Sequence, residues 1–95
     1  MLGNLDHCVQ ALAMLTKETF SIASIRVPVK RRKTLDAEKV LLLAEDILEN
    51  GQRTPIRVRK DGDGYVLIEG LHRLEALIAL GEETVEGYKV KARLH

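Results

Sequence analysis

The stretch "YVLIEGLHRLEALIALG", residues 65–81, changes its hydrophobic rhythm halfway along. Its first five residues are typical of a short β-strand, and the part after Gly70 has the apolar spacing of a helix that ends at Gly81. His72 and Arg73 fall in the first turn of that helix. The helix dipole already makes this turn positive, so two cationic side chains are unfavourable there unless something negative lies nearby. The junction therefore predicts a strand–helix connection and a candidate anion site.

The most regular helical pattern in the chain covers residues 35–51, "LDAEKVLLLAEDILENG". Asp36 or Thr34 can cap this helix at its start, and Gly51 can end it in a left-handed conformation. Every third or fourth position is apolar, which indicates one buried face. We expect that face to consist of Val40, Leu43, Ala44, Ile47 and Leu48.

Two segments precede this helix. "FSIASIRVPV", residues 20–29, is rich in β-branched residues and contains a proline, so it predicts one strand that continues to about Val27. The basic run "KRRKT", residues 30–34, is then expected to be a loop. Nearer the N-terminus, residues 5–15 have the apolar stripe of an amphipathic helix.

The segments that follow it complete a β-sheet. "TPIRVRK", residues 54–60, predicts a strand with Ile56 and Val58 facing inward. The turn "DGDG" joins this strand to residues 65–69 in a β-hairpin, and residues 85–92 form the last strand. Helices and strands thus alternate along the chain, which predicts an α+β fold: a small mixed β-sheet with flanking helices.

Length and composition favour a single soluble domain over residues 1–95. A chain of this length buries roughly 60–68% of its unfolded surface, enough for one modest core. The apolar runs are shorter than the roughly 20 residues that cross a bilayer. The N-terminal segment also lacks the basic start and apolar stretch of a signal peptide. We therefore expect a cytoplasmic protein without a membrane partner.

No motif predicts a metal site. Cys8 is the one cysteine, so an internal disulfide and a cysteine metal cluster are excluded. The three histidines lie in unrelated segments, and "DGDG" lacks the further ligands of a calcium loop. The phosphate-binding loop of the P-loop proteins does not occur either.

A second candidate site is the basic segment from Arg26 to Lys33, which has five cationic residues and no acid. Because the net charge of the chain is only +1, such a local cluster predicts a compact anionic ligand or a small patch of nucleic acid. Lys39 lies one turn inside the following helix and could reach the same anion. We therefore expect the run from Lys30 to Lys33, together with Lys39, to contact phosphate.

Each site also has a simpler explanation. Glu69 or Glu75 could neutralise Arg73, which would leave His72 as an ordinary exposed side chain. The basic segment could equally be a solvated surface loop.

From residue 22 to residue 92 the sequence resembles the N-terminal domain of ParB-type proteins, in the ParB/sulfiredoxin superfamily. The resemblance is carried by "RRKTLDAEKVLLLAEDILENGQRTPIRVRKDGDGYVLIEGLHRLEALIALG". Its pattern is a basic residue before a helix, "NG" at the helix end, a "PI-V" strand, a hairpin, and a glycine before a helix that ends in "LG". The resemblance implies a family-matching core over residues 22–92, with residues 1–20 as an N-terminal helical extension.

The resemblance also implies that the chain binds nucleotide phosphates, of CTP or ATP, with magnesium as an accompanying ion. The binding residues would come from the basic segment and the helix start: Arg31, Arg32, Lys39, Gly70, Leu71, His72 and Arg73. Partition ParB proteins have "GERR" where this chain has "GLHR", which is closer to the "GCHR" of sulfiredoxins. Leu71 occupies the position of the sulfiredoxin cysteine and cannot act as a nucleophile, which argues against sulfiredoxin activity.

Three functions are compatible with this resemblance. The chain could be a nucleotide-binding module of a plasmid or DNA-partition system, with nucleic acid or a DNA-associated protein as partner. We expect it to act without a helix-turn-helix of its own, since none follows the resembling segment in the sequence. Alternatively it could be a phosphotransferase or nuclease that uses Glu69, or an interaction protein that has lost the site.

Overall fold

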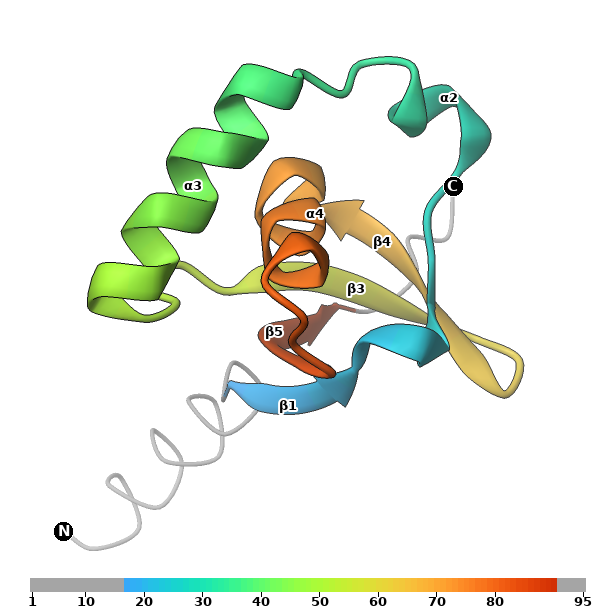
Figure 1. Ribbon diagram of the computed structural model, residues 1–95. Coiled ribbons are helices and arrows are strands. Elements are labelled where there is room, and N and C mark those ends of the chain that lie inside the picture. The colour runs from blue at the N-terminus through green and yellow to red at the C-terminus, as the bar shows by residue number, and fades with distance from the viewer. Residues whose placement is uncertain (1–16, 91–95) are drawn as a thin grey trace, which may run out of the picture.

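Residues 17–90 are described in the computed structural model of the protein (Figure 1). The helix expected over residues 5–15 lies outside this range, as do the last two residues of the strand expected over 85–92. The elements follow the order strand, short 3₁₀ turn, strand, two helices, hairpin, helix, strand. They are β1 (Glu18–Ser21), η1 (Ile22–Ser24), β2 (Ile25–Arg26), α2 (Val29–Arg32), α3 (Ala37–Asn50), β3 (Ile56–Asp61), β4 (Gly64–Glu69), α4 (Leu71–Ala79) and β5 (Thr84–Val90).

The five strands form one mixed sheet in the order β1-β5-β3-β4-β2. β1 is antiparallel to β5, and β3 is antiparallel to β4 in the predicted hairpin. β5 is parallel to β3, and β2 is parallel to β4. This arrangement confirms the predicted α+β fold with a small mixed sheet.

The sheet is curled, because its two edge strands are neighbours in the sequence. Only the three residues of η1 separate β1 from β2, and that link reaches roughly 13 Å at most. Five flat strands would place the two edges about 19 Å apart. Curling also brings the ring of Phe20 on β1 to 4.9 Å from the ring of Tyr65 on β4, in an edge-to-face contact. The protein core lies inside this curl.

The single strand predicted from Phe20 to about Val27 is therefore wrong. The segment divides into β1 and β2, which lie at opposite edges of the sheet. The Ser24 hydroxyl donates to the Ser21 carbonyl across η1, and the Ile22 amide donates to the Glu83 carbonyl beyond β1. A run of β-branched residues shows strand propensity but not a change of partner, so the sequence pattern missed this turn.

The basic run predicted as a loop is a short helical turn. Residues 29–32 form α2, and the Arg31 and Arg32 amides both donate to the Pro28 carbonyl. Pro28 is the N-cap of this turn, where its missing N–H removes no hydrogen bond of the helix. The prediction of an irregular loop is thus wrong, although the segment is exposed as expected.

Helix α3 begins and ends where the sequence predicts. The Asp36 carboxylate accepts hydrogen bonds from two amides of the first turn, and Gly51 ends the helix at a φ of 77°. Ala44 and Ile47 are buried, with Val40 and Leu43 partly buried beside them. Leu48 is 77% exposed, so its assignment to the buried face is wrong. Helix α3 packs mainly on α4, and that narrow contact does not reach the far edge of the predicted stripe.

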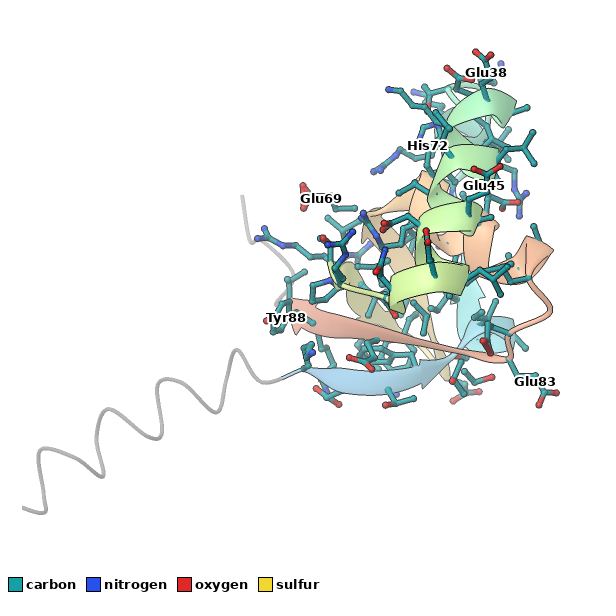
Figure 2. The ribbon with its side chains drawn as sticks, turned by 60° about the vertical axis from the view of Figure 1, so that its left-hand side comes forward. Glu38, Glu45, Glu69, His72, Glu83 and Tyr88 are labelled. Atoms are coloured by element: carbon teal, nitrogen blue, oxygen red, sulfur yellow. The ribbon has the colours of Figure 1, made fainter. Side chains whose placement is uncertain are left out.

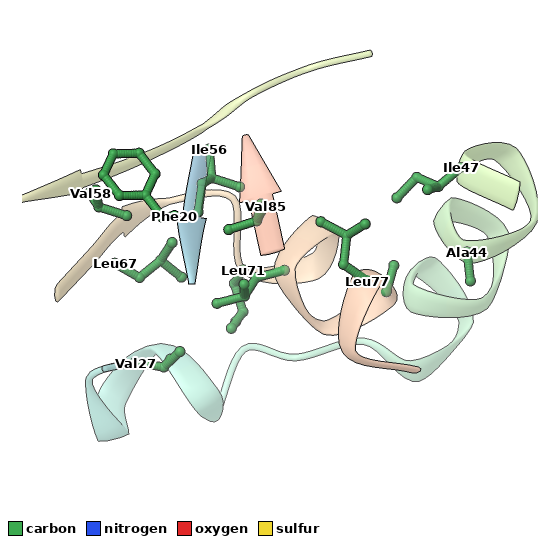
Figure 3. Close-up of a cluster of buried hydrophobic side chains, with 12 residues drawn as sticks. Phe20, Val27, Ala44, Ile47, Ile56, Val58, Leu67, Leu71, Leu77 and Val85 are labelled. Atoms are coloured by element: carbon green, nitrogen blue, oxygen red, sulfur yellow. The ribbon is translucent and has the colours of Figure 1, made fainter. Parts of the chain in front are cut away.

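Helix α4 lies between α3 and the strands (Figure 1). Its Leu71, Leu74 and Leu77 are each at most 4% exposed and face the interior. Figure 3 shows Leu77 between the strands and the Ala44 and Ile47 side chains of α3. From the sheet, the same core receives Ile56, Val58, Leu67 and Val85, which confirms the inward orientation predicted for Ile56 and Val58. Among residues 17–90, no helix is both long and apolar enough to cross a membrane.

Candidate functional site

The junction between β4 and α4 leaves an uncapped helix start. Gly70 has a φ of 109°, and no side chain caps the helix. The first intrahelical bond runs from the Leu74 amide to the Gly70 carbonyl, at 2.9 Å. The amides of Leu71, His72 and Arg73 therefore have no partner within the helix, as for any helix start. Such amides, together with the helix dipole, favour an anion.

Gly70 is required by packing as well as by its backbone angle. A Cβ atom built there would lie 2.6 Å from Ile56 Cγ2, closer than side chains approach one another in folded proteins. The missing side chain thus faces the core, not a ligand. Gly70 therefore allows the close packing of this junction against β3.

Leu71 can contribute only its backbone to the site. Its side chain is 4% exposed and belongs to the hydrophobic core. The residue in the position of the sulfiredoxin cysteine is thus a structural leucine. Its amide remains available at the helix start.

His72 joins the starts of two helices. Its Nε2 accepts a hydrogen bond of 2.9 Å from the Asp36 amide, 36 residues earlier in the chain. A nitrogen that accepts cannot also carry the proton, so the neutral ring has its proton on Nδ1 and can donate from there. Figure 2 shows His72 beside the end of α3 that carries Glu38. The starts of α3 and α4 are therefore adjacent.

Arg73 is half-buried and close to α3. The pKa of Asp46 is lowered first by a hydrogen bond from Arg53 and then by one from Asn50, with a smaller contribution from the charge of Arg73. Within residues 17–90, neither Glu69 nor Glu75 forms an ion pair with Arg73. Asp46 on α3 is therefore the acid whose charge interacts with that of Arg73.

The basic turn α2 reaches the same junction from the other side. The Arg31 guanidinium donates to the carbonyl of Ile68. Ile68 is the extra residue of a β-bulge, since Arg57 pairs with Glu69 whereas Val58 pairs with Leu67. Arg32 lies 3.9 Å from the Glu75 carboxylate on α4. Both arginines thus connect α2 to the segment around Gly70.

At the start of α3, the free backbone amides are capped by the side chain of Asp36, the N-cap residue. Asp36 Oδ1 accepts from the Glu38 amide at 3.0 Å and from the Lys39 amide at 3.4 Å. The Lys39 side chain is exposed one turn from the hydrogen bond to His72. Of the two adjacent helix starts, α4 is the one that lacks a capping carboxylate, so an anion would bind there.

Glu69 lies at the edge of this region and has a different partner. Its carboxylate is 3.4 Å from Arg57 Nε, and both side chains are mostly exposed. Figure 2 shows Glu69 projecting away from α3. A catalytic role for Glu69 stays a prediction that no contact in the structure favours. Within residues 17–90, no group of three potential ligands could hold a metal ion.

Within the described residues 17–90, two cavities beside the helices are lined by neither His72 nor Arg73. One, of about 350 Å³, is an apolar groove between α3 and α4 that Leu35, Val40, Leu41, Glu75 and Ile78 help to line. The other, of about 240 Å³, lies beside Thr19 and Gln52. The candidate anion site is therefore the surface where α2 and the starts of α3 and α4 meet.

Sequence reasoning missed two parts of this region. The sequence predicts Asp36 only as a helix cap, and nothing nearby in the sequence indicates the hydrogen bond from its amide to His72. Glu75 was considered as a partner of Arg73 but contacts Arg32. Covariation between sequences could have revealed both contacts; charge patterns within one sequence could not.

The family model of the ParB N-terminal domain matches residues 9–94. The chromosome-partitioning protein ParB of Myxococcus xanthus is 46% identical over 54 residues, which are 57% of this chain and 18% of that protein. The chromosome-partitioning protein Spo0J of Thermus thermophilus is 40% identical over 65 residues, 67% of this chain and 24% of that protein. The chain thus spans about a fifth to a quarter of the length of these relatives.

Two solved structures share the fold. Sulfiredoxin from Arabidopsis thaliana superposes with a TM-score of 0.73 at 30% identity, covering 81% of this chain and 86% of that one. A C-terminally truncated ParB from Caulobacter crescentus, complexed with CTP-gamma-S, gives a TM-score of 0.68 at 26% identity, covering 84% and 46% of the two chains. These similarities confirm the fold predicted from the resemblance.

Proposed function

This chain belongs to the ParB N-terminal domain family, and from that membership we propose that it binds the phosphates of a nucleoside triphosphate. The binding surface is formed by the first turn of α4, the basic turn α2 and the start of α3. Amides of Leu71, His72 and Arg73, the Nδ1 proton of His72 and the guanidinium groups of Arg32 and Arg73 supply the donors.

The observation that carries this proposal is the meeting of three chain segments at one uncapped helix start. His72 is fixed by the Asp36 amide, and Arg31 holds α2 against the carbonyl of Ile68. Donors in fixed positions bind an anion with less loss of conformational freedom than flexible side chains do. A charged hydrogen bond from Arg73 contributes roughly 1.5–3 kcal/mol, more than the dipole alone.

CTP and ATP are the proposed nucleotides, with magnesium as the accompanying ion that would offset part of their charge. The Caulobacter crescentus ParB structure contains a CTP analogue, which supports CTP. The sequence "GLHR" lacks the acidic and first basic residue of the partition-type "GERR" and is closer to the sulfiredoxin form, so ATP is tested beside CTP. Both contain the same triphosphate, and the proposed contacts are to phosphate.

The names of the relatives suggest the setting. Two of them are chromosome-partitioning proteins, so we place the domain in a DNA-partition or related regulatory system. Nucleic acid or a DNA-associated protein is the corresponding partner. The plasmid context and the cytoplasmic location predicted from the sequence belong to the same proposal.

Thermal unfolding tests the proposal directly. The melting temperature of the full 95-residue chain is measured with CTP, ATP, GTP and UTP, each with and without magnesium. We expect CTP or ATP to raise it, because a ligand at 100 times its Kd stabilises the folded state by about 2.7 kcal/mol. Arg73→Ala should weaken binding roughly 10- to 100-fold and remove most of the increase.

Lys89→Ala is the matched control, because it removes one exposed positive charge from β5, away from α4. This variant should keep the full increase in melting temperature. If no nucleotide stabilises the wild-type chain, or if Lys89→Ala loses as much as Arg73→Ala, the proposed site is wrong.

A further inference from the structure

We propose that Glu75 is an affinity-determining residue of the anion site, because its carboxylate competes with the ligand for Arg32. This inference rests on the proposed function and adds a residue to it. In the absence of ligand, Glu75 holds the guanidinium that a phosphate would otherwise engage.

The position of Glu75 is the first support. It lies on α4, one turn beyond the uncapped start at Leu71, and its carboxylate is 3.9 Å from Arg32 Nη1. Arg31, the neighbouring arginine, donates to the Ile68 carbonyl and so fixes α2 against β4. Arg32 is therefore held within reach of both Glu75 and the first turn of α4.

The surroundings of the two side chains are the second support. Glu75 is 20% exposed and borders the apolar groove beside Leu35, Val40 and Ile78, whereas Arg32 is 59% exposed. Among residues 17–90, Arg32 is the one cation within ion-pair distance of Glu75. The carboxylate thus has a fixed place on the helix, while the arginine can turn toward a ligand.

The energetic scale favours competition over permanent pairing. Ion pairs with one exposed partner are weak, and this one is at the limit of ion-pair distance. A triphosphate offers more charge and several acceptor oxygens, so it should displace Glu75. The apparent affinity is lowered by the fraction of molecules in which Arg32 remains with Glu75. Removal of the carboxylate should raise affinity by roughly two- to fivefold.

The test is a calorimetric titration of wild type and of Glu75→Gln with CTP, ATP and inorganic tripolyphosphate. It measures the dissociation constant for each probe. Glutamine keeps the shape of the side chain beside the groove and removes its charge. We expect Glu75→Gln to bind each probe two- to fivefold more tightly. Tripolyphosphate should show the same gain as the nucleotides, because Arg32 would contact phosphate and not base.

Two variants distinguish competition for Arg32 from a general electrostatic effect of removing a negative charge. Glu38→Gln removes an exposed acid from the first turn of α3 without releasing Arg32 and should give less than half the gain. In the Arg32→Ala background, Glu75→Gln should give no gain. Circular dichroism of each variant confirms that it is folded at the titration temperature.

The outcomes distinguish this inference from the proposed function. If the wild type binds nucleotide but Glu75→Gln binds no more tightly, or if the gain persists without Arg32, competition is refuted and the nucleotide site stands. If no variant binds any of the three probes, the proposed function is refuted, and this inference with it.

Discussion

Replacing Gly70 with alanine should destabilise the protein through the core and not through the ligand site. The added Cβ would lie 2.6 Å from Ile56 Cγ2 and 3.0 Å from Ile56 Cβ. Ile56 is fully buried and also contacts Gly87, so it has little room to move. Overpacking of a core costs about 1–3 kcal/mol. The left-handed backbone adds about 1–2 kcal/mol for a residue with a side chain. We expect a total loss of roughly 2–5 kcal/mol.

Gly81→Ala is the comparison that isolates the clash. Gly81 ends the same helix at a φ of 80°, but nothing lies within 4 Å of a Cβ built there. That variant should lose only the backbone part, about 1–2 kcal/mol. Any effect of alanine on the unfolded chain is common to both variants and cancels.

Urea unfolding, monitored by circular dichroism, gives the free energies of unfolding of Gly70→Ala and Gly81→Ala. At low temperature, where Gly70→Ala is still folded, it should retain nucleotide binding, because its added methyl group faces Ile56. Equal stability of the two variants would refute the packing argument. A folded Gly70→Ala protein that no longer binds nucleotide would show that the glycine serves the ligand instead.

Three further predictions concern the helix cap of α3, the stability of the protein at low pH and the curled sheet. Asp36→Ala should lower the free energy of unfolding by about 0.5–2 kcal/mol in urea, because two amides of α3 lose their acceptor; an unchanged value would exclude the cap. The lowered pKa of Asp46 means that its hydrogen bond from Arg53 stabilises the protein above the ordinary carboxyl pKa of 3.8 and is lost as the pH falls through the lower folded value. The difference in melting temperature between wild type and Asp46→Asn should therefore shrink from pH 7 to pH 2, and a constant difference would contradict this. Phe20→Ala should cost about 3–5 kcal/mol, and a double-mutant cycle with Tyr65→Ala should give a coupling of about 0.5–1.5 kcal/mol; additive losses would mean that the two rings do not meet.

The sequence predicted those helices and strands whose boundaries depend on residues close together in the chain. The caps at Asp36 and Gly51, the alternation of Ile56 and Val58, and the change of period at Gly70 each act within a few residues, so one sequence shows them. The division of one apparent strand into β1 and β2 depends on partners 40 or more residues away. Strand propensity carries no information about such partners.

The candidate site was predictable to a similar degree. The basic residues His72 and Arg73 directed attention to the uncapped start of α4, and the basic segment lies against it. The choice of partner could not be predicted, because one sequence does not show which arginine each of Glu69, Glu75 and Asp46 meets in space. The structure assigns them to Arg57, Arg32 and Arg53 in that order.

The pairing of β1 with β5 has a consequence for synthesis of the chain. Glu18 is opposite Gly87, so β1 has no partner until β5, the last described strand, has been made. β3 and β4 can form their hairpin at once, and α3 and α4 need only neighbouring segments. Contacts between distant parts of a chain slow folding. We therefore expect the hairpin and the helices to form first during synthesis, and the curl to close only after β5 has been made.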